Sequence, residues 1–536
     1  MFKEITSISK NYAIVKLKDN INEDLLNLNA IFEEEDKKIL GEIEEVIDKS
    51  AKITFLGEFN NGKFFSGIIR KPSLNASIRL INEEELNELT QENDPYSMPL
   101  GSSPLYNNCK INVNIDNLFS NHTAIFGNTG SGKTYGVARL VQNLFTLKDK
   151  IPFNSNFFIF NNTSEYDNAF KEINKYNVNF NYKAYTTSDT TQNNSIKIPL
   201  WLLSADDYAN LLDATEYSQI SVIEKMLSLV SVFARDDKEA HRYKNHLIAK
   251  AILSILYSNQ MPARMRDQIF TIVEECHTEE LNLDFEVPGV GYTREFRKCF
   301  EIDSQGQFVE RVLITEYIHK FIDNDTKWKE DFIPVYFTLD DLETALNFAL
   351  ISEGLLLNEK SYAEGIALKV KLHTLALVKV YSRILFRFTK GLSNRGAMPI
   401  HIMLEEAHRY VQKDLDNTIL GYNIFERIAK EGRKFGLILD LITQRPTELS
   451  ETVISQCSNF LIFKINHPTD LEYIRKMVPN ISADVIEKQK TLQSGTCVAF
   501  GPMMKIPTIV KMDLPSPEPH SANAKIYQKW MVEWKQ

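Results

Sequence analysis

Gly127-Asn128-Thr129-Gly130-Ser131-Gly132-Lys133-Thr134 is the stretch that decides the fold of this chain. The apolar run Thr123–Phe126 precedes it, and a helix-like run over 135–145 follows it. Glycines let successive backbone N–H groups point at phosphate oxygens, and the following helix adds its positive N-terminal end. Strand, loop and helix in this order predict a phosphate-binding loop in an α/β fold, rather than an ordinary glycine-rich turn.

Each residue type in this loop has its own expected role in binding a nucleotide. The backbone of Gly127, Asn128, Thr129, Gly130, Ser131 and Gly132 is predicted to surround the phosphates. Lys133 is predicted to reach the β- and γ-phosphates, and the Thr134 hydroxyl to ligate Mg²⁺. ATP and Mg²⁺ are therefore the expected cofactors, and ATP hydrolysis is the expected reaction.

A second predicted strand ends in two carboxylates that could take part in the same ATP hydrolysis. The apolar run 400–404 ends in Glu405-Glu406-Ala407-His408, which is typical of a Walker B element. We assign Glu405 to the Mg²⁺ shell and Glu406 to the base that polarises the attacking water. The alternative is a strand followed by an acidic helix start, where carboxylates also suit the helix dipole.

Three further residues are candidates for the nucleotide site. Glu165 follows the predicted buried strand 157–160, at the end where ligand groups gather in open α/β sheets. Arg433 precedes the predicted strand 437–442 and could reach a neighbouring subunit's γ-phosphate; a solvated basic helix end is the alternative. Gln444 ends that strand and could hydrogen-bond the γ-phosphate or the water; a polar turn is the alternative.

The first 95 residues differ from the rest of the chain. Short β-type runs at 12–17, 52–56 and 66–69 alternate with turns such as 60–63, which predicts a small β-barrel. The polar segment 91–95 is expected to be the linker that ends this domain.

The remaining 441 residues read as one α/β core that a helical insertion interrupts. Further core strands are expected at 459–463 and 496–500, and the clearest long helix at 362–388. Trp530 and Trp534 are spaced to share one helical face, and their tail could pack on its own subunit or brace a neighbour. The expected parts are a RecA-like core at 96–204 and 396–514, a mainly helical insertion at 205–395, and a tail at 515–536.

Composition limits the class of protein. A chain of 536 residues suggests roughly two to four domains. No apolar stretch approaches the roughly 20 residues of a membrane span, and five cysteines without a CxxC pair suit a reducing cytoplasm, so we expect a cytoplasmic protein with no membrane partner. The net charge of −10 disfavours generic binding along the outside of DNA, but not a local basic lining of a channel.

Together these motifs resemble the HerA family of hexameric DNA-translocating ATPases, relatives of FtsK. The resemblance covers nearly the whole chain, from the N-terminal barrel (the family's HAS-barrel) to the phrases 198–204, 432–436, 443–446 and 492–501. Two departures stand out. Glu405 replaces the Asp that the family often has, and Asn161-Asn162-Thr163-Ser164 replaces Asp-Pro-His-Gly before Glu165-Tyr166.

The resemblance implies a homohexamer with ATP bound between subunits, double-stranded DNA in the central channel and an effector protein docked on the barrels. That effector would be a NurA-type nuclease in an archaeal DNA-end-resection motor, or a nuclease or sirtuin-type NAD hydrolase in a bacterial anti-phage complex. The Asn-, Lys- and Ile-rich composition favours the anti-phage interpretation. A hexameric scaffold that ATP regulates, and that activates the effector without translocation, is the alternative from a different functional class.

Overall fold

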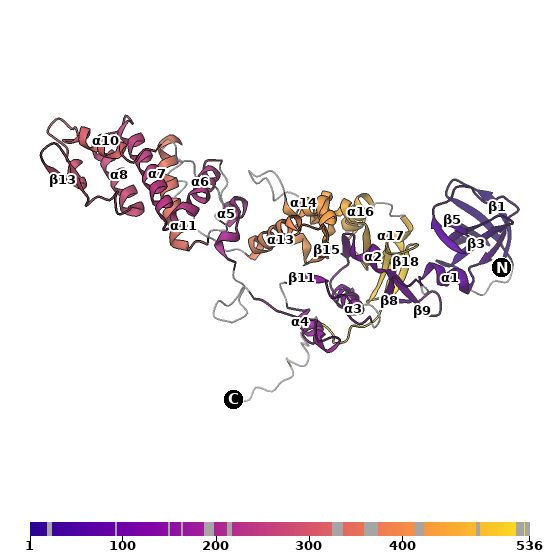
Figure 1. The fold of residues 1–536 in the computed structure, drawn as a ribbon. Coiled ribbons are helices and arrows are strands. Elements are labelled where there is room, and N and C mark those ends of the chain that lie inside the picture. The colour runs from indigo at the N-terminus through magenta and orange to yellow at the C-terminus, as the bar shows by residue number, and fades with distance from the viewer. Residues whose placement is uncertain are drawn as a thin grey trace. The chain divides into compact units, whose positions relative to one another are not determined.

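The computed structural model describes most of the chain (Figure 1). The described residues are 1–18, 24–91, 94–147, 151–161, 164–186, 198–211, 217–323, 336–357, 374–412, 423–478, 483–520 and 530. The chain divides into two compact units. The first comprises residues 1–186, 381–416 and 422–536, and the second comprises residues 187–380 and 417–421.

The N-terminal β-domain is a curved antiparallel sheet of seven strands (Figure 1). Its strands are β1 (Phe2–Ile8), β2 (Tyr12–Leu17), β3 (Asn29–Glu34), β4 (Lys37–Ile47), β5 (Ser50–Asn60), β6 (Lys63–Ser66) and β7 (Ser77–Leu80). They pair in the order β1-β2-β5-β4-β3-β7, with β6 beside β5. Alternate apolar side chains such as Ala13, Val15, Ile43 and Ile53 form its core, as period-2 patterning requires.

Two details of this domain differ from the sequence-based expectation. The third run was expected at 66–69, but β6 begins at Lys63, because the turn is the tight Asn61-Gly62 pair, both with positive φ. Gln91, expected in a solvated linker, is 5% exposed. Its amide donates hydrogen bonds to the carbonyls of Asn112 and Met503, so the domain is joined to the core by packed polar contacts.

The core of the first unit is a nine-stranded mixed sheet in the order β11-β14-β15-β10-β16-β17-β18-β8-β9. Its parallel half comprises β11 (Asn156–Phe160), β14 (Ile400–Glu405), β15 (Leu437–Thr443), β10 (Thr123–Phe126) and β16 (Asn459–Phe463). Its antiparallel half comprises β17 (Thr496–Phe500), β18 (Thr508–Met512), β8 (Ser97–Ser103) and β9 (Cys109–Asn114). The α/β class is thereby confirmed.

Continuous apolar sequence accounts for the central strands. Every residue of β10, β14, β15 and β16 is buried, as expected where helices cover both faces of a parallel sheet. β11 is at the edge and is only partly buried, with Phe158 38% exposed, so the expectation of a buried strand there was wrong.

Helices of the first unit pack on this sheet (Figure 1). One face carries α3 (Lys133–Phe145) and α4 (Asp167–Phe170), which share a cluster of buried apolar residues with the strands. The other helices are α1 (Glu83–Leu89), α2 (Ile115–Phe119), α14 (Ile424–Glu431), α15 (Glu451–Gln456), α16 (Pro468–Met477) and α17 (Ala483–Lys490). Most of α13 (Thr374–Gly391) also belongs here; residues 358–373 of the predicted long helix lie outside the described residues.

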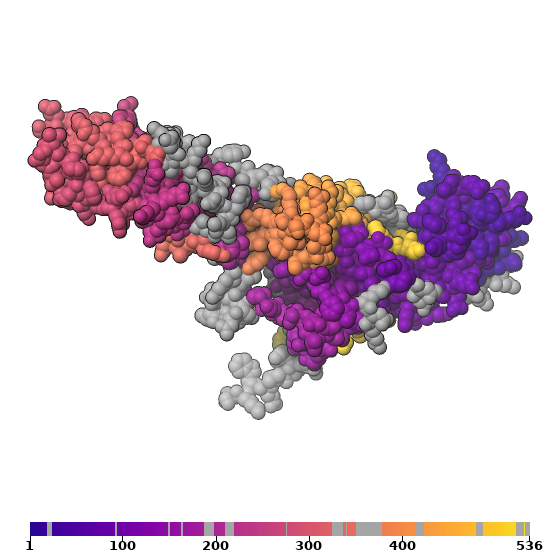
Figure 2. All heavy atoms as spheres, viewed as in Figure 1, coloured from indigo at the N-terminus to yellow at the C-terminus, as the bar shows by residue number. Residues whose placement is uncertain are grey.

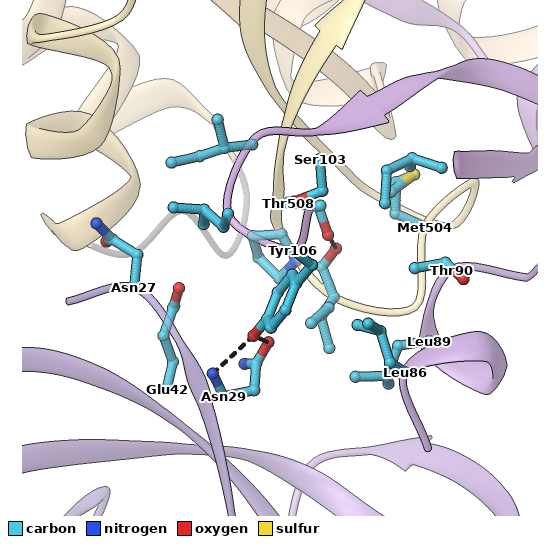
Figure 3. Close-up of a pocket in the computed structure, with 15 residues that line it drawn as sticks. Asn27, Asn29, Glu42, Leu86, Leu89, Thr90, Ser103, Tyr106, Met504 and Thr508 are labelled. Atoms are coloured by element: carbon cyan, nitrogen blue, oxygen red, sulfur yellow. Dashed lines mark hydrogen bonds between the residues drawn. The ribbon is translucent and has the colours of Figure 1, made fainter. Parts of the chain in front are cut away.

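The β-domain packs against residues from the end of the core. In Figure 2 the late part of the chain (yellow) abuts the N-terminal part (indigo). Ile506 shares an apolar cluster with Ile31 and Leu40, and Lys488 forms an ion pair with Glu42. Figure 3 shows a pocket at this junction, where the Tyr106 hydroxyl donates to the Asn29 side chain and accepts from the Asn29 N–H, both at 2.8 Å.

The second unit is mainly helical. Its elements are α5 (Ala205–Leu211), α6 (Tyr217–Phe233), α7 (Lys238–Leu256), α8 (Pro262–Cys276), α9 (Phe296–Cys299), α10 (Arg311–His319) and α11 (Leu339–Leu357), with a hairpin of β12 (Glu286–Pro288) and β13 (Thr293–Glu295). Asp237 caps α7 by accepting from the N–H groups of Glu239 and Ala240. No helix among the described residues combines the length and apolar character needed to cross a membrane.

A C-terminal strap, residues 515–520, lies across α3 and α4 and is hydrogen-bonded along its length. Gln142 accepts from the Ser516 N–H at 2.9 Å and donates to the Pro517 carbonyl at 2.9 Å. Asn168 donates to the Glu518 carbonyl at 2.7 Å. Of the two tail tryptophans, Trp530 is 79% exposed and Trp534 lies outside the described residues.

Candidate functional site

The parallel register brings three loops together at the carboxyl ends of the strands. Phe126 at the end of β10 pairs with Thr443, and Glu405 at the end of β14 pairs with Ile442. The chain therefore leaves β10, β15 and β14 at the same level, just before Gly127, Gln444 and Glu406. Strand β15 lies between the other two, so Gln444 lies between the glycine-rich loop and the carboxylates.

The loop 127–134 folds as a cradle whose lysine contacts its own backbone. The Lys133 ammonium donates to the carbonyls of Gly127 at 2.7 Å and Asn128 at 3.0 Å. Burial lowers the pKa of Lys133, and the nearby carboxylates of Glu405, Glu406 and Glu165 act in the opposite direction. A phosphate oxygen entering the cradle would meet a nearly buried cation that already faces inward.

Neighbouring segments hold the loop from outside. Gly132, with φ of 101°, begins α3, and a Cβ there would lie 2.7 Å from the Gly495 nitrogen. The Gly495 N–H donates to the Ser131 carbonyl at 2.9 Å, and the Ser494 hydroxyl donates to the Gly130 carbonyl at 2.8 Å. The turn before β17 therefore packs directly against the glycine-rich loop. A side chain at position 132 would collide with the backbone of that turn, so only glycine fits there.

Glu405 is buried beside the loop and is held by a tyrosine. Its exposed fraction is 7%, and its Oε2 accepts from the Tyr166 hydroxyl at 2.7 Å. Burial raises the pKa of Glu405 to about 7, while the Tyr166 hydrogen bond and the Lys133 charge act to lower it. Thr134 lies close enough to the same hydroxyl to act on the pKa of Tyr166, which burial raises. The two residues predicted to hold Mg²⁺ therefore both lie beside Tyr166.

Glu406 turns the other way, towards Gln444. Its backbone is left-handed, with φ of 52°, which is uncommon for a residue with a side chain and marks a strained turn. Gln444 donates to Glu406 Oε1 at 3.2 Å and accepts a short hydrogen bond from the Thr129 hydroxyl. The glycine-rich loop is therefore connected to Glu406 through Gln444.

Two buried oxygen atoms of the site make no hydrogen bond within the described part of the chain. They are Ser131 Oγ in the loop and Glu406 Oε2. His408 Nδ1 lies 3.3 Å from Glu406 Oε2 but is hydrogen-bonded to Thr443 at 2.9 Å, and burial lowers the pKa of His408. Unsatisfied buried polar atoms are unusual in a folded protein, and here one belongs to the glycine-rich loop and the other to the carboxylate that Gln444 connects to that loop.

The remaining predicted residues lie in different places. Glu165 is half-buried beside Tyr166, close enough to act electrostatically on Lys133. Arg433 is exposed in the short helix Gly432–Phe435, ahead of β15 and near His122, which precedes β10. Arg433 therefore lies at the opposite end of the strands from the nucleotide loop. The seven residues of β15 span about 20 Å, so Arg433 cannot reach the loop of its own subunit.

Sequence reasoning missed several residues that shape this site. Tyr166 was quoted only as part of a motif, and the contacts of Gln142, Ser494 and Gly495 were not foreseen. The adjacent Glu165 was the one available signal for Tyr166. The others depend on segments that lie more than 300 residues from the loop in sequence.

Comparison with known proteins agrees with this geometry. Residues 98–277 match the family model described as the central domain of the helicase HerA. The chain is 25% identical to the DNA double-strand break repair helicase HerA of Saccharolobus solfataricus over 474 residues, which cover 87% of this chain and 77% of that protein. It is also 25% identical to the same enzyme of Sulfolobus acidocaldarius over 460 residues, covering 86% and 77% of the two chains.

Among solved structures, VirB4 of Thermoanaerobacter pseudethanolicus aligns with a TM-score of 0.36 and 13% identity, over 78% of this chain and 97% of that one. The sequence matches, taken with the loop and carboxylates described above, make this chain a homologue of the HerA helicases and a P-loop ATPase.

Two glycines of the loop offer a matched pair of substitutions. Gly130 and Gly132 both have positive φ, but a Cβ at Gly130 would meet open space. Gly130→Ala should cost about 1–2 kcal/mol from backbone strain alone. Gly132→Ala should cost about 2–5 kcal/mol, because the collision with Gly495 is added. Thermal unfolding without nucleotide should show the larger loss for Gly132→Ala; equal losses would contradict the packing of the loop against Gly495.

Proposed function

Because this chain is a P-loop ATPase with a HerA central domain, we propose that it is a ring motor that hydrolyses ATP to translocate double-stranded DNA for a partner effector. The observation that carries this proposal is the linked trio of Thr129, Gln444 and Glu406. Such a link can couple the presence of a γ-phosphate to the position of the catalytic base, which a motor needs and a static nucleotide site does not.

Roles within the site follow from position. Lys133 and the loop backbone bind the phosphates, and Thr134 and Glu405 hold Mg²⁺, which when bound would neutralise phosphate charge. Among the described residues, no three His, Cys, Asp or Glu side chains cluster to hold a metal alone. That suits Mg²⁺, which proteins bind through one or two side chains together with nucleotide phosphates. Glu406 is the base, and Gln444 senses the γ-phosphate. Glu165 is the third carboxylate that acts on Lys133.

Substitutions at these residues test the proposed hydrolysis. Glu406→Gln should keep ATP bound but slow turnover by roughly 10²–10⁴-fold, because it keeps the shape and removes the base. Lys133→Ala should weaken binding itself. Steady-state ATPase and nucleotide-binding assays measure both. If Glu406→Gln turns over normally while Glu405→Gln is inactive, the two roles are reversed.

The same ATPase assay separates a motor from a scaffold. Duplex DNA should stimulate turnover by the wild-type chain, and the Glu406→Gln variant should show no such response. A wild-type ATPase that ignores duplex DNA would support the alternative of an ATP-regulated scaffold.

We propose that the motor is a homohexamer in which Arg433 acts across a subunit interface. Arg433 is exposed and far from its own loop, and a planar, permanently charged guanidinium is suited to phosphate recognition in a neighbouring site. Closed rings arise when one surface of a subunit binds a different surface of the next. The proposed ring places double-stranded DNA in its central channel.

Mixed rings test the shared site. Arg433→Ala should abolish ATP turnover but leave folding and ATP binding intact. Mixing Arg433→Ala with Lys133→Ala subunits should restore part of the activity, because some interfaces then combine an intact loop with an intact arginine. Native mass spectrometry should verify subunit exchange, and exchanged rings without recovery would contradict action across the interface.

We further propose that the effector docks on the N-terminal β-domain. Phe65 is 55% exposed and Ile69 is 93% exposed, at and just beyond β6. Both adjoin Glu58, and neighbouring exposed apolar side chains are typical of interaction surfaces. Composition favours an anti-phage complex with a nuclease or sirtuin-type NAD hydrolase as effector. The names of the relatives, double-strand break repair helicases, favour the second candidate, a DNA-end-resection motor with a NurA-type nuclease.

Surface variants are the suitable test of docking. Deleting the whole β-domain would also disturb the core, because Gln91 is packed against it. The double variant Phe65→Ser/Ile69→Ser should lose the effector that co-purifies with the wild-type chain, as identified by mass spectrometry, while its oligomer size stays the same. Val290→Ser, 99% exposed on the helical unit, is the control and should retain the effector. Smaller oligomers in the double variant would instead indicate that the β-domain holds the ring together.

A further inference from the structure

Tyr166 holds one of the two residues assigned to Mg²⁺ and lies beside the other. It immediately precedes α4 and is 2% exposed. Its hydroxyl donates to Glu405 Oε2, at the end of β14, at 2.7 Å. Thr134, in the first turn of α3, lies close enough to act on the pKa of Tyr166.

The direction of this hydrogen bond matters. A phenol hydroxyl carries one proton, and here that proton is donated to Glu405 Oε2. The second oxygen of Glu405 is thereby left for a cation. Removing a group that orients a metal ligand in this way typically lowers metal affinity by roughly 10–100-fold.

We propose that Tyr166 is a positioning residue for the magnesium ion of Mg·ATP, acting through Glu405. This inference rests on the proposed ATPase function and adds a residue that no motif assigned. Tyr166 touches neither substrate nor metal in this role; it fixes the Glu405 side chain before the ion arrives.

The surroundings of Tyr166 keep its hydroxyl in place. Its ring stacks on Phe170, with centroids 6.1 Å apart and planes at 14°. Gln142 on α3 donates to the Ala169 carbonyl at 3.1 Å, and the Tyr182 hydroxyl donates to Asp167 at 2.6 Å. The C-terminal strap adds a hydrogen bond from the His520 N–H to the Glu165 carbonyl at 2.8 Å. Tyr166 is therefore fixed by α3, α4 and the strap.

A phenylalanine distinguishes the hydroxyl from the ring. Tyr166→Phe keeps the stacking on Phe170 and removes only the hydrogen bond to Glu405. Tyr182→Phe is a matched control, since it removes a tyrosine–carboxylate hydrogen bond to the same short helix, one residue from Tyr166, but does not touch Glu405 or Thr134.

The experiment is a Mg²⁺ titration of the binding of a fluorescent, non-hydrolysable ATP analogue to the full-length chain. Tyr166→Phe should raise the Mg²⁺ concentration for half-maximal binding by roughly tenfold, the usual loss when a partner of a metal ligand is removed. Binding in EDTA should match the wild-type chain. Tyr182→Phe should leave the Mg²⁺ requirement unchanged, and thermal unfolding should show that both variants are folded.

A double-variant cycle gives a second measurement. If Tyr166 acts through Glu405, adding Tyr166→Phe to Glu405→Gln should raise the Mg²⁺ requirement by much less than the product of the two single effects. An unchanged requirement in Tyr166→Phe, equal shifts in both tyrosine variants, or fully multiplicative effects would overturn the inference. A wild-type chain that binds no analogue with Mg²⁺ would overturn the proposed ATPase function as well.

Discussion

The parallel pairing of β14, β15 and β10 is the constraint on which the site depends. Because Phe126 pairs with Thr443 and Glu405 pairs with Ile442, three loops leave the sheet at one level. A slip of one residue in this register would move the ends of the strands out of level and turn every side chain of the slipped strand to the other face of the sheet. Glu405 therefore faces the buried side of the loop, and the left-handed turn at Glu406 directs the next carboxylate elsewhere.

The order of the strands in the sheet, rather than the sequence of any one strand, connects Glu406 to the glycine-rich loop. Gln444 lies 315 residues after Thr129 in sequence, yet it bridges Thr129 and Glu406 because β15 is inserted between β10 and β14. The apolar runs and the polar residues that end them were readable from the sequence, since a buried parallel strand must be continuously apolar and its ligand residues must follow it. The order of the strands was not, because nothing local encodes which strands become neighbours.

The parts of the fold that sequence reasoning missed share one physical cause, because each depends on contacts with segments that lie far away in the sequence. β8, with the sequence Ser-Met-Pro-Leu-Gly-Ser-Ser, lacks the β-branched residues that mark a strand, and it pairs because of its neighbours. Gly101 there allows β18 to approach so closely that a Cβ would lie 2.2 Å from the Lys511 carbonyl oxygen. Gln142 is 1% exposed, and its side chain is held by hydrogen bonds to Ser516 and Pro517 of the C-terminal strap, more than 370 residues away in sequence.

Charge around Lys133 explains why the proposed ligand is Mg·ATP rather than ATP alone. Three carboxylates, those of Glu405, Glu406 and Glu165, act on this single buried ammonium. A triphosphate entering alone would add negative charge to a site that already has an excess, in surroundings where water screens poorly. A divalent cation held by the proposed ligands Glu405 and Thr134 would remove that conflict. The same reasoning favours the proposed role of Glu406 as the base, because its side chain is hydrogen-bonded to Gln444 and would not have to give up a metal ion to accept a proton.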